Sequence, residues 1–146
     1  MKKTLVFIFA GILLVSCGEK QKASKEKQHY DESIDEILVV HDEVMPKMGA
    51  LSSLIEKTET KIDTTEIGKE FENVNQELKQ AHELMMTWMK DFGEKFPNAL
   101  VDTTYSKEEY EKREPILSAE KEEVKEMKDR VNKSIEKAQE LLTKTS

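Results

Sequence analysis

The stretch EIGKEFENVNQELKQAHELMMTWMKDF, residues 66–92, carries the clearest structural signal in this chain. Its apolar side chains recur at alternating intervals of four and three residues, which is typical of a long helix packed against other helices. We expect Asp63 or Thr64 to cap its start and Gly93 to end it. The seam consists of Ile67, Phe71, Val74, Leu78, Ala81, Met85, Trp88 and Phe92.

A second helix is predicted before this stretch, from about Ser33 to Thr58. Ser33 and Glu36 have the spacing of a capping box, and the proline at position 46 is expected to bend the axis. The apolar positions again follow a spacing of three and four: Ile34, Ile37, Leu38, His41, Val44, Met45, Met48, Leu51, Leu54 and Ile55.

A third helical region follows the loop around Pro97. Ser106 and Glu109 form another capping box that opens a short helix, and Pro115 is expected to start or kink a long helix that ends near Leu142. No segment has the alternating pattern of a strand. The sequence therefore predicts an all-α fold, an elongated antiparallel three-helix bundle with coiled-coil character.

The first sixteen residues have the organisation of a bacterial lipoprotein signal peptide. Two lysines precede the apolar run LVFIFAGILLV, residues 5–15, which is too short to span a membrane as a helix. Leu14-Val15-Ser16-Cys17 then matches the lipobox, and Cys17 is the sole cysteine. By resemblance to that motif, we expect cleavage before Cys17 and attachment of several acyl chains, which makes a durable anchor. The alternative is an ordinary signal peptide with a coincidental cysteine.

Three domains follow from this interpretation: residues 1–16 as the cleaved signal, 17–30 as lipidated cysteine and flexible polar linker, and 31–146 as the helical bundle. Residues 18–22 lack the acidic cluster that directs some lipoproteins to the cell surface, which favours the outer membrane facing the periplasm. Loss of two signal-peptide lysines leaves 21 basic and 30 acidic side chains, a net charge of −9. An acidic exported chain is a poor partner for nucleic acid.

Histidine and methionine recur together in two similar strings, HDEVMPKM at 41–48 and HELMMTWM at 82–89. Positions three or four apart share one helix face. With turns centred near residues 62 and 103, antiparallel pairing places His41 level with residue 84 and Met85 level with residue 121. Met127 falls into the same half of the bundle. The candidate metal ligands are His41, Met45, Met48, His82, Met85, Met86 and Met89.

Two interpretations of this cluster remain open. Thioethers and neutral imidazoles suit Cu(I) or Ag(I), so the cluster can be a soft-metal site. Alternatively, methionine fills a core disturbed by Pro46, and Trp88 is a packing residue that reports on the region. Further alternatives are a Met-lined opening for a hydrophobic ligand or partner helix, reversible sulfoxide formation, and haem, for which no attachment motif exists.

Catalytic signatures are missing, so we do not expect an enzyme. The chain has no Gly-rich phosphate loop, no nucleophile elbow, and no second histidine at zinc-protease spacing after His82. Asp42 and Glu43 are expected to be surface charges, since adjacent helical residues point apart. Glu120 lies near the third seam, where it can approach a histidine or reach solvent.

The lipobox, the string at 41–48 and the string MMTWMKDF at 85–92 resemble small Bacteroidota lipoproteins of unknown function, sometimes named "viral A-type inclusion protein". The resemblance implies a lipid anchor and a helical fold, and it implies no activity. The sequence thus predicts a membrane-anchored lipoprotein that acts by binding Cu(I) or Ag(I). The alternative is an envelope scaffold that uses its heptad stripes to bind a protein partner or another copy.

Overall fold

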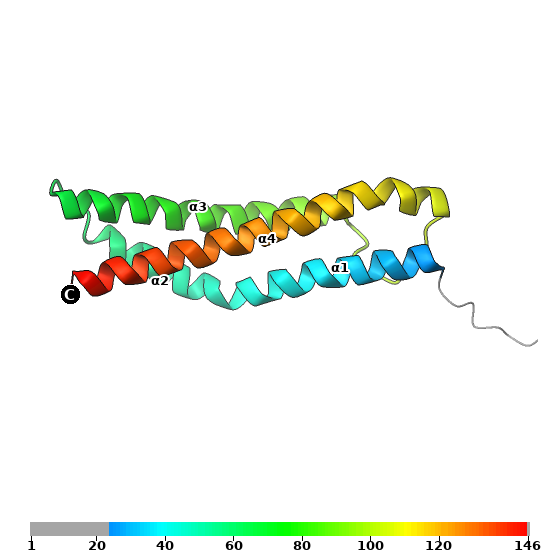
Figure 1. Ribbon diagram of the computed structural model, residues 1–146, viewed down its shortest axis with the longest axis horizontal. Coiled ribbons are helices and arrows are strands. Elements are labelled where there is room, and N and C mark those ends of the chain that lie inside the picture. Colours follow the sequence, from blue (N-terminus) through cyan, green and yellow to red (C-terminus); the bar gives the residue numbers. More distant parts are fainter. Residues whose placement is uncertain (1–23, 146) are drawn as a thin grey trace, which may run out of the picture.

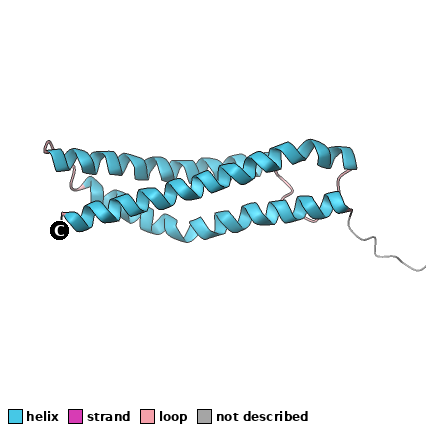
Figure 2. Ribbon diagram, in the orientation of Figure 1, coloured by secondary structure: helices cyan, strands magenta, loops and turns pink. Residues whose placement is uncertain are grey.

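The computed structural model describes residues 24–145, which form a long bundle of helices and contain no strand (Figures 1 and 2). The predicted signal peptide, Cys17 and the first linker residues lie outside the described residues. In Figure 1, α1 and α2 run one after the other along one side, α3 returns, and α4 crosses between them. The predicted three-helix bundle is therefore confirmed. Its elements are α1 (Lys25–Val44), the 3-10 turn η1 (Met45–Lys47), α2 (Met48–Glu59), α3 (Glu66–Lys95) and α4 (Lys107–Lys144).

Helix α1 begins eight residues before the predicted start, so residues 25–30 are not the flexible linker that we expected. The Ser24 hydroxyl accepts a hydrogen bond from the Lys27 backbone N–H at 3.1 Å and caps the helix. Ser33 is buried inside α1 and caps nothing. The added turns bring the Tyr30 ring to 5.7 Å from both Tyr105 and Tyr110. This aromatic contact stabilises the extra turns. It joins residues far apart in the sequence, so the local spacing of apolar residues does not predict it.

Helices α1 and α2 together form one long rod, which we call the first rod. Pro46 lies in η1 and interrupts this rod, as expected. Proline has no backbone N–H, so the helical bond to the carbonyl four residues earlier is missing there. Because of this break, α1 and α2 pack against different helices. α1 packs on α4, whereas α2 packs mainly on α3, and the backbones of α1 and α3 approach one another at few points.

Helix α3 starts and ends differently from the prediction. Its cap is Thr65, whose hydroxyl accepts from the Gly68 N–H at 3.0 Å, while the Asp63 carboxylate accepts from the Thr65 N–H at 2.9 Å. Gly93 lies inside the helix, which continues to Lys95. Gly93 does not take the left-handed conformation of a helix-ending glycine. The buried ring of Phe96 extends the packed seam beyond Gly93 and accounts for the longer helix.

The two glycines of α3 should respond in opposite ways to alanine. A Cβ atom on Gly68 would lie 2.6 and 2.7 Å from the backbone N and O of Asp63, whereas one on Gly93 meets nothing within 4 Å. Gly68→Ala should therefore lower the free energy of unfolding by about 1–3 kcal/mol through overpacking. Gly93→Ala should raise it by about 0.5–1 kcal/mol. Chemical denaturation measures both, and equal signs would contradict the close approach of the 60–65 turn to α3.

Helix α4 confirms one prediction and corrects another. The capping box is present: the Ser106 N–H donates to the Glu109 carboxylate at 2.9 Å, and the Glu109 N–H donates to the Ser106 hydroxyl at 3.3 Å. Pro115, however, lies within one continuous helix instead of dividing it. Tyr110 and Leu117 are both buried on either side of the proline, so packing against the bundle continues through it.

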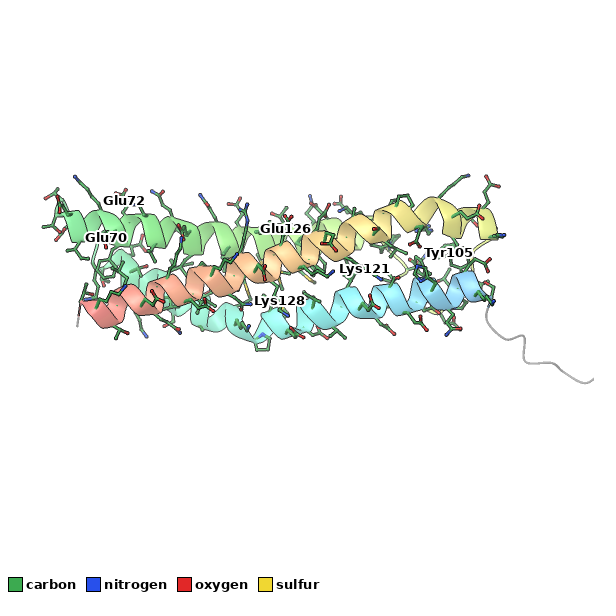
Figure 3. The ribbon with its side chains drawn as sticks, viewed as in Figure 1. Glu70, Glu72, Tyr105, Lys121, Glu126 and Lys128 are labelled. Carbon is green, nitrogen blue, oxygen red and sulfur yellow. The ribbon has the colours of Figure 1, made fainter. Side chains whose placement is uncertain are left out.

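Helices α1 and α4 run parallel with a constant register. Four polar pairs each join a residue of α1 or η1 to the residue of α4 that is 85 positions later. Three of these pairs follow one another at intervals of seven residues, as in a heptad repeat. Lys121 and Lys128 lie on the side of α4 that faces α1 (Figure 3). The pairs are His29–Glu114, Glu36–Lys121, Glu43–Lys128 and Lys47–Asn132. We call this row the heptad ladder.

Candidate functional site

The two histidine–methionine strings lie at the same level of the bundle. The His41 ring stacks on Trp88 with centroids 5.5 Å apart, about one helical turn from the predicted register. Trp88 and Met127 line the same surface depression, so Met127 also belongs to this level. Residues 41–48 therefore do lie beside residues 82–89, which is the juxtaposition that the metal hypothesis requires.

The predicted register between α3 and α4 is wrong by about nine residues, roughly 13 Å at 1.5 Å per residue. Lys95 pairs with Glu120 at 2.8 Å, and Lys137 pairs with Glu77 at 2.7 Å. Met85 is thus level with residues near 130, not 121. The cause is the 96–106 connection, which extends beyond the end of α3 before α4 begins, so the hairpin is not symmetric about residue 103.

Around the bundle axis, the candidate ligands separate into three groups. His41 and Met85 are buried, as is Met127, which was not among the candidates. Met48 and His82 are half-buried. Three thioethers remain accessible, with exposed fractions of 48% for Met45, 58% for Met86 and 41% for Met89. The structure therefore does not bring all seven candidates to one surface.

The exposed methionines border the outer seam between the first rod and α3. On α3, Asn75 donates to the carbonyl of Ile55, and Lys79 pairs with Glu59, so this stripe faces α2. The same stripe continues, in steps of three and four residues, as His82, Met86 and Met89. Met45 follows one turn after His41, whose ring contacts α3. We call the set Met45, His82, Met86 and Met89 the methionine seam.

His41 is the most unusual side chain at this level. It is only 8% exposed, and its Nδ1 lies 3.0 Å from a carboxylate oxygen of Asp42. Within residues 24–145, its buried Nε2 has no hydrogen-bond partner. A carboxylate at Nδ1 favours the tautomer with the proton on that atom, which leaves Nε2 with a free lone pair. Asp42 and Glu43 are exposed, as expected of surface charges, but the Asp42 carboxylate nevertheless reaches Nδ1 of the adjacent His41, a contact that was not predicted from the sequence.

Aromatic rings continue from His41 along the space between α1 and α3. Trp88 stacks on Phe92 at 5.2 Å, and Phe92 contacts Phe96 at 5.2 Å. These large rings fill the gap left by the separated backbones of α1 and α3. In the described part of the chain, the Trp88 indole N–H also lacks a hydrogen-bond partner. Two neighbouring side chains at this level, His41 and Trp88, therefore each carry a buried polar atom without a partner, as Tyr30 and Glu120 do elsewhere in the core.

Glu120 neither reaches solvent nor approaches a histidine. Its side chain is completely buried and pairs with Lys95, which also pairs with Glu123 at 2.8 Å. Burial lowers the pKa of Lys95, but the hydrogen bonds to Glu120 and Glu123 outweigh that effect and leave the pKa raised. Glu120 is therefore a structural ion-pair residue of the α3–α4 interface.

Neither a metal cluster built from His, Cys, Asp and Glu nor a helix able to cross a membrane is found within residues 24–145. Comparison with protein-family models, curated proteins and solved structures finds no match to this chain. Sequence reasoning identified His41, the methionines and the packing role of Trp88, but it missed the contact of Asp42 with His41 and the stacking of Trp88 on the His41 ring. The adjacency of Asp42 to a buried histidine was the available signal.

Proposed function

We propose that this chain is a lipid-anchored helical protein of the bacterial cell envelope that binds Cu(I) or Ag(I) at the methionine seam. The lipobox supports the anchor, with Cys17 as the lipidated residue and the outer membrane facing the periplasm as its location. The His41 imidazole carries the metal assignment. It is buried, its Nδ1 lies 3.0 Å from Asp42, its Nε2 has no hydrogen-bond partner within residues 24–145, and the methionine seam lies at the same level of the bundle.

The chemistry of the donors fits a soft monovalent ion. Thioethers are neutral and polarizable, and a neutral imidazole is a stronger donor that completes such a set without a thiolate. Met45 lies one helical turn from His41, while Met86 and Met89 border the seam from α3. Methionine has three rotatable side-chain bonds, so exposed thioethers can turn inward at small cost. In this proposal, Met85 remains a core residue, and Met48 and His82 stay secondary candidates.

Trp88 has a place in the proposal as a neighbour of the ion. Its indole face stacks on His41, and an aromatic face attracts a nearby cation. It is also the single tryptophan of the chain. Binding at His41 should consequently quench tryptophan emission, which gives an optical signal specific to this level of the bundle.

Anaerobic titration with Cu(I) and Ag(I) against a competing chelator tests the proposal. The chain from residue 18 onward is suitable because, within residues 24–145, the buried core residues lie between Tyr30 and Leu141 and because this shortened chain has no cysteine. We expect about one ion per chain, with quenching of Trp88. The double variant Met86→Leu with Met89→Leu should weaken binding by at least about tenfold, a loss of about 1.4 kcal/mol.

Two further variants make the result interpretable. Met127→Leu conserves volume at a buried position outside the seam and should leave the affinity unchanged. His41→Phe keeps a ring against Trp88 but removes the nitrogen donor, and it should abolish quenching. Equal affinity in the wild type and in all three variants would exclude a site at the seam, as would uptake of several ions without saturation.

A further inference from the structure

An open groove runs between α1 and α4 on the side of the bundle away from the methionine seam. Its volume is about 550 Å³, and its apolar lining includes Ile37, Val40 and Val124. Val39 also lines it and is 58% exposed. The two walls differ in charge. Three acidic residues come from α1, Glu32, Asp35 and Glu36, and two lysines come from α4, Lys121 and Lys125.

We infer that this groove binds a second copy of the same chain, in a parallel dimer whose two-fold axis follows the bundle. Rotation about that axis places α1 of one copy over α4 of the other, so each acidic wall meets a basic wall. A two-fold axis across the bundle would instead place α1 over α1 and oppose acidic walls. Charge complementarity therefore selects both the partner and its direction. Within one copy, the Lys121 ammonium already holds the pKa of Glu36 below its usual value.

The parallel arrangement also agrees with the proposed anchor, on which this one step of the inference rests. Both copies of α1 then begin at the same end of the dimer, and two lipids can enter the same leaflet. An antiparallel dimer would place the two anchors at opposite ends. The seam lies away from this groove, so dimerisation leaves it open.

Sedimentation and cysteine crosslinking of the chain from residue 18 test the inference. In buffer with a metal chelator, the wild type should approach the mass of two copies as concentration rises. Val39→Lys should return it to one copy, because the change places a positive charge in the apolar contact, opposite the partner's basic wall. Ile116→Lys is the matched control, since Ile116 is 44% exposed on α4 and does not line the groove.

Crosslinking determines the direction of the two copies. Because this chain has no cysteine of its own, Val39→Cys, Glu36→Cys, Lys121→Cys and Lys125→Cys each introduce a single thiol. The parallel dimer places α1 of one copy over α4 of the other, so mixed disulfides should form between Val39→Cys and Lys125→Cys chains and between Glu36→Cys and Lys121→Cys chains. Ile116→Cys chains mixed with Val39→Cys chains should form few. A monomer at all concentrations, or same-residue disulfides at Val39 in place of the mixed ones, would overturn the parallel dimer. Measuring Ag(I) binding by Val39→Lys shows whether the metal proposal fails as well.

Discussion

A Cys17→Ser chain should carry no fatty acid at all. Lipidation forms a thioether on the cysteine sulfur, and the serine hydroxyl is a far weaker nucleophile, so the first step of maturation stops. We expect the precursor to accumulate with residues 1–16 still attached. Growth with an alkyne-tagged fatty acid, followed by dye coupling and a gel, measures the label and the size shift together.

Membrane fractionation alone would not test this prediction. An uncleaved precursor retains the apolar run at 5–15, which can hold it at the membrane without lipid. The label is therefore the deciding measurement, and Lys20→Ala, three residues after the cysteine, is the matched control. Equal fatty-acid label in Cys17→Ser and the wild type would exclude lipidation at Cys17, and residues 1–16 would then be interpreted as an ordinary signal peptide.

Lys95→Met should lower the free energy of unfolding by about 3 kcal/mol, because it leaves the Glu120 carboxylate buried without a partner. Loss of the paired charge costs more than the ion pair itself contributes, since Glu120 has no exposed surface through which water can compensate. Urea denaturation followed by circular dichroism measures the change.

The converse substitution should behave differently. Glu120→Met removes the buried charge together with its desolvation cost, while the Lys95 ammonium keeps Glu123 and partial contact with solvent. We expect little change or a gain of about 1 kcal/mol. Glu123→Gln, at an exposed pair, should stay within about 0.5 kcal/mol of the wild type. If Lys95→Met and Glu120→Met lowered the free energy of unfolding equally, the prediction would be wrong, because it requires the unpaired buried carboxylate to cost more than the unpaired lysine.

The pH dependence of this contribution follows from the raised pKa of Lys95. A lysine with a higher pKa in the folded chain stabilises the fold fully below its unfolded value, here 10.5. That stability is lost as the pH rises through the higher folded value. The difference between Lys95→Met and the wild type should accordingly be complete at neutral pH and shrink only in strongly alkaline solution.

The spacing of apolar residues predicted most of the fold because burial in a bundle depends directly on that spacing. Phe71, Leu78 and Val124 are buried as expected. Met45 and Ile67 are exposed exceptions, one at the η1 break and the other near the start of α3. Helix ends were harder to predict. The start of α1 depends on contacts of Tyr30 with residues about eighty positions away, which local sequence does not encode.

The sequence predicted where the candidate site lies along the bundle, but not which of its side chains are buried and which are exposed. The strings at 41–48 and 82–89 meet because hairpin geometry places them level. Which side chains face inward depends on the separation of α1 from α3 and on the way Trp88 fills it. Burial of Glu120 and the partner of His41 follow from the same tertiary packing, so residue type and spacing were insufficient to predict them.

The heptad ladder has a consequence for the order of assembly. Its partners are 85 positions apart, so they meet only after the intervening chain has been closed into a loop. Loop-closure entropy opposes such contacts until nearer segments have formed. The turn at 60–65 and the 96–106 connection bring α2, α3 and α4 together first. We therefore expect α1 to dock last, which makes the helix that follows the proposed anchor the final part of the chain to fold.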